Sequence, residues 1–221
     1  MFNGAFGTPK RIWNLLREIS LLLLVGLALL PAFKMKFWNI GAEGQMLMGA
    51  FASAALMIYC PNLPNAVLIP LIMVCSCLAG VIWGIIPAYF KAKYDTNETL
   101  FTLMMNYIAM QLISFSIVFW ENPTGSNTVG LINPTTSRGW FPAVFGQRYG
   151  LNLIIVIAVT AAVAYYLRYT KHGYEINVVG ESWDTARYAG INVKKVIIRT
   201  MTLSGAICGL SGCLVVSGAS H

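Results

Sequence analysis

Residues 170–199 read TKHGYEINVVGESWDTARYAGINVKKVIIR and form the most charged part of the chain. Long apolar runs lie on both sides of this segment, one over 151–169 and one over 196–217. A polar segment between two apolar runs of about 20 residues is typical of a loop that joins membrane-spanning helices. We therefore expect a membrane protein in which residues 170–198 form a charged loop outside the hydrocarbon.

Within this loop, residues 182–190 predict one short helix. Ser182 can cap its first turn, Asp184 suits the positive end of the helix dipole, and Gly190 can end it in a left-handed conformation. A helix of about seven residues is not stable alone in water, because helix nucleation is costly. The helix must therefore pack against something.

The same helix carries two small residues, Ala186 and Ala189, that would allow a partner to approach closely. Two interpretations stay open from the residues alone. The loop is shaped to meet a partner at the membrane surface, or it is a solvated connector between spans, since charge runs are usually solvated faces.

The composition excludes an ordinary soluble protein. Hydrophobic residues make up 57% of the chain and charged residues only 10%, whereas soluble domains carry about 25% charged residues. The net charge of +7 is spread over short loops between apolar runs, which indicates membrane orientation rather than nucleic-acid binding. The five cysteines match no zinc or redox spacing, so we interpret them as small packing residues.

Six apolar runs are each long enough, at about 20 residues, to cross about 30 Å of hydrocarbon as a helix. None of them alternates as the strands of a membrane barrel do, and in lipid the backbone must satisfy its own hydrogen bonds. The sequence therefore predicts an all-α, polytopic transmembrane helix bundle of about six spans, in a single domain over 1–221. The runs are 12–33, 40–59, 66–90, 99–120, 151–169 and 196–217.

The distribution of Lys and Arg predicts the orientation of the bundle. Ten of these residues lie in the alternate connections 34–38, 91–98 and 168–199, and five lie elsewhere. The positive-inside rule places the richer set in the cytoplasm, so that the loop over 170–198 is cytoplasmic and 121–148 is an outer loop. The first residues would then lie outside, which predicts that an earlier span is missing.

The first polar cluster inside the apolar runs is WNIGAEGQ, over 38–45. Glu43 and Gln45 would lie at or near membrane depth, and Gly41 and Gly44 permit a sharp change of backbone direction. An ionisable residue in a span is a candidate functional residue. The alternative is a tight, solvated turn between two helices.

The second polar cluster is TNETLFTLMMNY, over 96–107, at the start of an apolar run. Asn106 would lie two turns deeper in the membrane than Glu98, and Gln111 about one turn deeper still. Buried amides need hydrogen-bond partners in hydrocarbon. They either bond to neighbouring helices or line a polar pathway.

Small residues recur in the last run, where Gly205, Gly209 and Gly212 stand among Ser and Cys. This spacing lets helix backbones touch and predicts close packing. The sequence has no GxxxxGK[ST] phosphate loop, no metal-ligand spacing and no nucleophile placed beside a histidine. We therefore predict no catalytic site, no metal site and no cofactor. A channel would need a polar pore-lining periodicity, which is not visible.

Three segments resemble one known family when they are taken together. They are NIGAEGQ over 39–45, TNETLFTLMMNYIA over 96–109, and GYEINVVG followed by ARYAGINVKK within 173–195. In this order they resemble the permease subunits of bacterial ABC importers, in the branch for nucleosides and simple sugars. They are more similar to the nucleoside permeases than to the ribose ones.

The resemblance implies a multi-pass protein of the bacterial plasma (inner) membrane that forms a pathway for a small-molecule substrate. It implies three partners: an ABC ATPase subunit that hydrolyses ATP, a second permease subunit, often in a heterodimer, and an extracytoplasmic substrate-binding protein. Membrane lipid surrounds the chain, and nucleic acid is not a partner. Relatives continue beyond both ends, so we expect a partial permease domain. A non-transporting structural subunit, or a permease for another small solute, stays open as an alternative.

The resemblance also implies roles for particular residues. The family's coupling helix, which contacts the ATPase, corresponds to 182–190, although Trp183 stands where relatives often have proline. We expect the substrate pathway to be lined by Glu43, Gln45, Asn106 and Gln111. The residues expected to couple the chain to the ATPase are Ser182, Asp184, Ala186, Arg187, Ala189 and Gly190.

Overall fold

The computed structural model describes residues 9–123, 125, 126, 128–134, 136–142 and 149–218. These residues form helices and irregular connections, with no strand among them, so the prediction of an all-α bundle is confirmed. The predicted outer loop over 121–148 lies partly outside the described residues. The helices are α2 (Pro9–Lys34), α3 (Ala42–Tyr59), α4 (Asn65–Tyr94), α5 (Glu98–Trp120), α6 (Gly150–Tyr169), α7 (Lys171–Glu181), α8 (Trp183–Tyr188) and α9 (Val193–Gly218).

Five helices in the described part of the chain are long and apolar enough to cross a membrane, namely Arg11–Lys34 within α2, together with α4, α5, α6 and α9. The sixth predicted run forms α3, which begins at Ala42 rather than at residue 40 and is 18 residues long. Its first turn contains the polar residues Glu43 and Gln45. Five of the about six predicted spans therefore meet this test of length and hydropathy among the described residues, and α3 is a shorter helix packed against α4 and α9.

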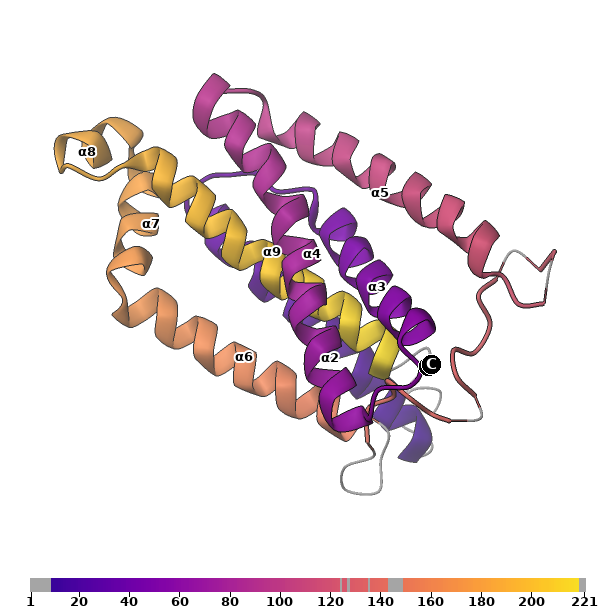
Figure 1. Ribbon diagram of the computed structural model, residues 1–221. Helices are drawn as coiled ribbons and strands as arrows, with labels where there is room; N and C mark the ends of the chain where they lie inside the picture. The colour runs from indigo at the N-terminus through magenta and orange to yellow at the C-terminus, as the bar shows by residue number, and fades with distance from the viewer. Residues whose placement is uncertain (1–8, 124, 127, 135, 143–148, 219–221) are drawn as a thin grey trace.

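The centre of the bundle is α9, which runs between α6 on one side and α5 on the other (Figure 1). Its glycines let it touch α3 and α4 backbone to backbone, as the spacing in the sequence predicts. A Cβ built on Gly205 would lie 2.5 Å from Gly80 O, and one on Gly209 would lie 2.1 Å from Ser76 O. A Cβ on Gly212 would lie 2.1 Å from Met46 O. Only glycine fits these contacts, since real Cβ atoms do not approach so closely.

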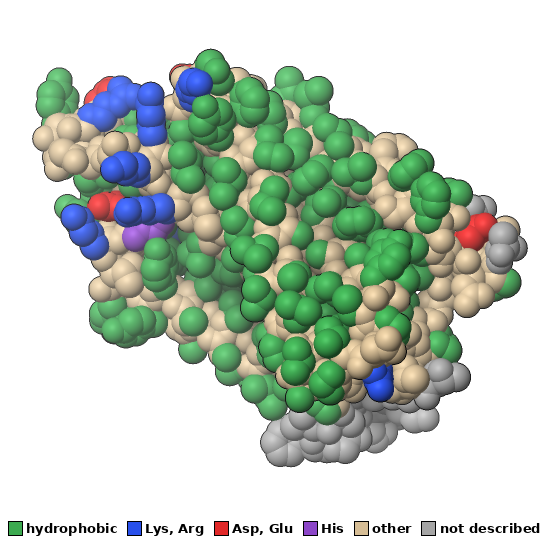
Figure 2. Space-filling view, in the orientation of Figure 1, with side chains coloured by type: hydrophobic (Ala, Val, Ile, Leu, Met, Phe, Trp, Pro, Cys, Tyr) green, Lys and Arg blue, Asp and Glu red, His purple; other side chains and the backbone are tan. Residues whose placement is uncertain are grey.

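Lys and Arg side chains gather at one end of the molecule, where α7 and α8 lie, while most of the visible surface elsewhere is hydrophobic (Figure 2). This end is where α2 and α4 finish and α9 begins. Gly180 of α7 lies directly against the end of α2, because a Cβ there would be only 1.9 Å from Lys34 O. Lys36 Nζ also donates to Glu181 O at 3.5 Å. That this end faces the cytoplasm stays a prediction of the charge distribution.

A buried histidine joins α6, α7 and α9 at the charged end. His172 Nδ1 lies 2.7 Å from the hydroxyl of Tyr166, and its Nε2 lies 3.5 Å from Thr200 Oγ1. The imidazole is 7% exposed, and burial lowers the pKa of His172 below its ordinary value. Glu175 and Arg199 act on it in opposite senses. The folded chain therefore prefers the neutral imidazole.

The lowered pKa of His172 predicts that acid destabilises the chain. A group whose pKa is lower in the folded state binds its proton more readily when unfolded, so stability falls as the pH drops through the ordinary histidine pKa of about 6.5. We expect the melting temperature of the detergent-solubilised chain to fall between about pH 7.5 and about pH 5.5. In His172→Gln this part of the pH dependence should disappear. The same slope in both proteins would assign it to other groups.

Candidate functional site

The connection between α2 and α3 runs back into the bundle instead of turning at its surface. Residues 35–41 are not helical, and Lys36 has a φ of 56°. Ile40 N donates to Thr102 Oγ1 at 3.2 Å. Thr102 is four residues into α5, which is a depth of about 6 Å along that helix. The predicted alternative of a solvated turn does not describe this segment, because it is packed against α5.

Asn106 replaces the hydrogen bonds that the interrupted backbone loses. Its Oδ1 accepts from Gly44 N at 2.8 Å, and its Nδ2 donates to Ile40 O at 2.9 Å. Asn106 lies eight residues into α5, so the start of α3 is about 12 Å deep along that helix. At such depth a broken helix is tolerated only where neighbouring groups satisfy its backbone. Gly44 is needed here, because a Cβ would lie 2.7 Å from Asn106 Oδ1.

Asn39 supports the same segment from the opposite direction. Its Oδ1 accepts from Gly41 N at 3.0 Å, and its Nδ2 donates to Ser204 Oγ of α9 at 3.4 Å. Asn39 has no exposed surface. The start of α3 is therefore held by α5 and α9 together, through side-chain amides on both sides.

Gln45 lies in the next layer and is 1% exposed. Its Oε1 has no hydrogen-bond partner among the described residues, and neither has the indole Nε1 of Trp83. Both atoms lie near the start of α3, since Trp83 Nε1 would be 3.2 Å from a Cβ on Gly44. An unpaired buried polar group costs about 1–3 kcal/mol. The region around the start of α3 therefore holds one acceptor, Gln45 Oε1, and one donor, Trp83 Nε1, without a partner among the described residues.

Glu43 faces outward from the first turn of α3 and is exposed. It lines a groove of about 470 Å³ between α2 and α3. Most of the groove wall is apolar, and its charged groups are two carboxylates and one guanidinium. The lining residues are Arg17, Glu18, Leu21, Leu22, Val25, Ala42, Glu43, Met46 and Val215.

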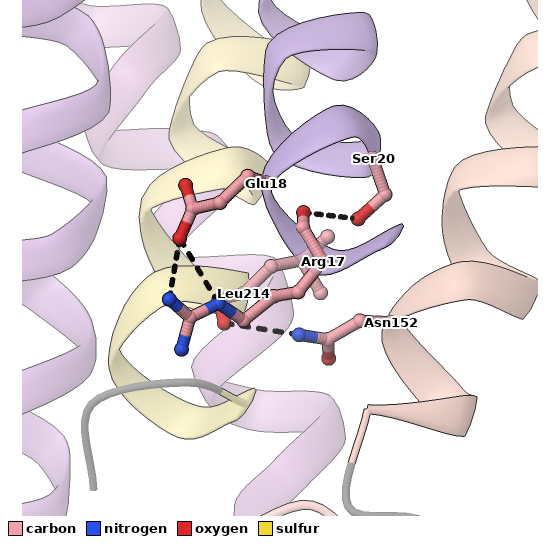
Figure 3. Close-up of polar contacts among 5 residues, drawn as sticks. All are labelled: Arg17, Glu18, Ser20, Asn152 and Leu214. Atoms are coloured by element: carbon pink, nitrogen blue, oxygen red, sulfur yellow. Dashed lines mark hydrogen bonds and ion pairs between the residues drawn. The ribbon is translucent and has the colours of Figure 1, made fainter. Parts of the chain in front are cut away.

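Figure 3 shows polar contacts within α2 and between α6 and α9, and those within α2 include the groove residues Arg17 and Glu18. Arg17 Nε donates to Glu18 Oε1 at 3.2 Å, and its guanidinium lies 5.3 Å from the centre of the Tyr149 ring. Asn152 Nδ2 donates to Leu214 O at 3.4 Å. The charged groups of the groove are thus the paired Arg17 and Glu18 and the carboxylate of Glu43.

Three of the four residues expected to line a pathway lie around Gly44, but they do not share one surface. Glu43 lines the groove, whereas Gln45 and Asn106 are buried inside the bundle. Gln111 is exposed on the outer face of α5. The sequence correctly indicates that Asn106 needs partners, and the structure shows those partners to be backbone groups of α3.

The predicted short helix is present as α8, Trp183–Tyr188, and is shorter than the expected 182–190. Ser182 Oγ accepts from Thr185 N at 3.3 Å, and Gly190 follows the helix with a φ of 76°. The predicted cap at Ser182 and the predicted left-handed conformation of Gly190 are therefore confirmed. Its role in contacting an ATPase stays a proposal.

The expectation that Ala186 belongs to a small docking face is wrong. Ala186 is 0% exposed and packs into the hydrophobic core of the chain itself. Ala189 is exposed, and so are the side chains of Asp184 and Arg187, which pair at 3.6 Å. Tyr188 is 94% exposed. The free face of α8 is therefore formed by charged and aromatic side chains, because the helix uses its alanine for its own packing.

The sequence does not predict the cleft between α8 and the end of α4. A cleft of about 660 Å³ separates α8 and the start of α9 from the end of α4, and Lys91, Asp95 and Trp183 line it. In the sequence, Lys91 is one of the basic residues that set the predicted orientation of the bundle. The nearby acidic residues at 95 and 98 were the signal that it has fixed partners.

Long apolar helices around a glycine-packed centre, a helix that begins inside the bundle and a capped surface helix define a multi-pass membrane protein of the transporter class. Residues 11–221 match the family described as "Branched-chain amino acid transport system / permease component", and the chain belongs to this family. It is therefore a non-catalytic, multi-pass component of the inner (plasma) membrane.

Characterised relatives match nearly the whole chain. The nucleoside ABC transporter permease protein NupB of Lactococcus lactis is 30% identical over 96% of this chain and 60% of its own length. The guanosine ABC transporter permease protein NupP of Bacillus subtilis is 32% identical over 97% of this chain and 62% of its own length. The glucose ABC transporter permease protein TsgB13 of Haloferax volcanii is 32% identical over 89% of this chain and 54% of its own length.

The chain thus spans less than two thirds of the length of these relatives. No solved structure matches it.

Proposed function

We propose that the chain is part of the permease subunit of an ATP-driven importer, and that its solute is a nucleoside. Membership of the permease family supports the first part. The match to NupB and NupP over nearly the whole chain supports the second. ATP hydrolysis would reside in a separate ATPase subunit. A second, related permease chain and an extracytoplasmic binding protein would complete the importer.

The observation that carries the proposal is the start of α3 inside the bundle. Transporters commonly form their solute sites where irregular backbone replaces helix at membrane depth, and residues 35–41 form such an interruption between α2 and α3. Glu43 stands at this interruption and lines the groove along α2. Its carboxylate can accept hydrogen bonds from the hydroxyl groups of a ribose or from the N–H groups of a base. Apolar groove walls suit the faces of the base.

Gln45 and Trp83, which lie near Glu43 at the start of α3, could also bind the solute. Their unpaired Oε1 and Nε1 would supply one acceptor and one donor if α3 shifts during the transport cycle. Asn106 would act on the solute indirectly, because both ends of its amide already hold the backbone. A sugar is the second candidate solute, and the similarity to TsgB13 favours it.

Two substitutions test whether the solute passes along the groove at Glu43. We expect Glu43→Gln to lower nucleoside uptake by about tenfold or more in the assembled importer, since it removes the charge that binds the solute's donors. Gln111→Leu on the outer face of α5 should leave uptake within about twofold of the wild type. The measurement is uptake of radiolabelled guanosine into cells or proteoliposomes, with unlabelled glucose as competitor.

Assembly serves as the control for both variants. The tagged chain should co-purify with an ATPase whose hydrolysis is stimulated by loaded binding protein, and both variants should assemble equally well. Loss of uptake in Gln111→Leu, with normal uptake in Glu43→Gln, would move the route to the face of α5. Uptake of radiolabelled glucose without uptake of guanosine would favour the sugar. If the chain recruits no ATPase, it is a non-transporting subunit.

A further inference from the structure

One ammonium group joins three elements at the charged end of the bundle. Lys91 is in the last turn of α4, and its Nζ lies 2.8 Å from Asp95 Oδ1 and 3.1 Å from Glu98 Oε2. The same Nζ lies 5.3 Å from the centre of the Trp183 ring, the first residue of α8. The side chain of Lys91 is only 14% exposed. It is therefore a fixed contact and not a mobile surface charge.

The partners of Lys91 are themselves held in place. Asp95 ends α4 in a left-handed conformation with a φ of 51°, and the hydrogen bond from Lys91 lowers the pKa of Asp95. The side chain of Glu98 is 16% exposed. Ser182 caps α8 and fixes the backbone from which Trp183 projects. Ammonium groups over an indole face are attracted by the ring quadrupole, and the attraction grows as water is removed.

A continuous set of contacts leads from this point to Glu43. Glu98 is the first residue of α5. Four and eight residues further along the same helix, Thr102 and Asn106 bond to Ile40 and Gly44. An α-helix is stiff over this length of about 12 Å. A displacement of Glu98 along the helix axis would therefore move the groups that hold the start of α3.

We propose that Lys91 is a positioning residue that fastens α8 to the start of α5, so that a movement of α8 reaches the start of α3 through α5. This inference rests on the proposed function, because it assigns α8 to the receiving end of a force from the ATPase. Within the membrane chain, the contacts of Lys91 would transmit this force from α8 to α5 and so to the start of α3. The contact of Lys36 Nζ with Glu181 O leads instead to α2, and so provides an internal comparison.

The first test uses the isolated chain and needs no partner. Trypsin cleavage after Arg187 reports how firmly α8 is held, and mass spectrometry identifies the fragment. Lys91→Met should speed this cleavage by about threefold or more, as loss of a partly desolvated cation–π contact implies. Trp183→Ala should do the same. Lys91→Arg and Trp183→Phe keep a cation and a ring, and should cleave at nearly the wild-type rate.

Lys93→Met is the matched control, because it removes a lysine from the same turn of α4. Lys93 Nζ contacts Tyr89 and Tyr94 of its own helix and not α8. Its cleavage rate after Arg187 should equal that of the wild type. Equal rates in Lys91→Met and wild type would overturn the inference, and so would equal acceleration in Lys91→Met and Lys93→Met.

The second test uses the assembled importer. Lys91→Met should still bind the ATPase and keep its basal hydrolysis, but stimulation by loaded binding protein should fall by about half or more. Lys91→Arg should restore it, and Lys36→Met should change it less. Full stimulation in Lys91→Met would overturn the inference while the proposed function stands. Failure of the wild-type chain to recruit an ATPase would overturn both, whatever the cleavage rates.

Discussion

Gly209→Val is expected to prevent the chain from reaching its stable fold. A Cβ at this position would lie 2.1 Å from Ser76 O, and Gly49 approaches the same residue, since a Cβ on Gly49 would lie 2.3 Å from Gly209 O. Backbone atoms on two neighbouring helices cannot both move away. Overpacking usually costs about 1–3 kcal/mol, and contact with backbone on two sides puts the cost at or above the upper end. The measurement is the yield of monodisperse protein in detergent and its melting temperature.

Gly26→Val supplies the matched control for that experiment. Gly26 lies in α2, and nothing comes within 4 Å of a Cβ built there. The substitution adds the same atoms and the same β-branching within a helix, so any effect of propensity is included. Its yield and melting temperature should stay close to the wild-type values. Equal losses in both variants would show that the central glycines are not special.

Much of the fold could be predicted because hydrophobic runs of membrane length leave few choices. In hydrocarbon the backbone must form helices, so runs of about 20 apolar residues fix the elements and their order. The ends of α8 were also predictable, because Ser182 and Gly190 act locally, through a side-chain cap and a left-handed residue. The packing of α9 followed from Gly205 and Gly209, since close contact of helix backbones requires small residues.

What could not be predicted depends on contacts between distant segments. The depth of the start of α3 is set by Asn106, which is 62 residues away from Gly44 in the chain. Ala186 could serve a partner or the chain itself, and its small side chain fits both equally. Lys91 reads as one basic residue among many until Glu98 and Trp183 are placed beside it.

The position of α3 could not be predicted for a related reason. The apolar run over 40–59 contains its polar residues at the start, and the structure places this start part of the way along the bundle, with Gln45 buried and Glu43 exposed. Glu43 is acceptable there because it faces the groove, and Gln45 because α3 is enclosed by its neighbours. Hydropathy alone does not distinguish a short span from a helix that begins at depth, since both give a shortened apolar run.

Asn106→Leu is expected to destabilise the chain and to abolish uptake together. Leucine has about the same volume, but it leaves Gly44 N and Ile40 O without partners in a buried region. Each unpaired group costs about 1–3 kcal/mol, so the total of about 2–6 kcal/mol exceeds the effect of most single substitutions. The released segment should move Glu43 away from its place at the groove. Melting temperature and guanosine uptake, measured on the same preparation, test both effects.

A graded series separates support of the backbone from direct contact with the solute. Asn106→Asp keeps the acceptor for Gly44 N but buries a carboxyl group against Ile40 O, which costs free energy, so its melting temperature should fall below that of the wild type. If Asn106 only supports the backbone, uptake follows stability through the series, because both depend on the same two hydrogen bonds. If Asn106→Leu melts like the wild type and yet transports nothing, the amide contacts the solute directly. The structure favours the first result, since Asn106 is 5% exposed and both ends of its amide are occupied.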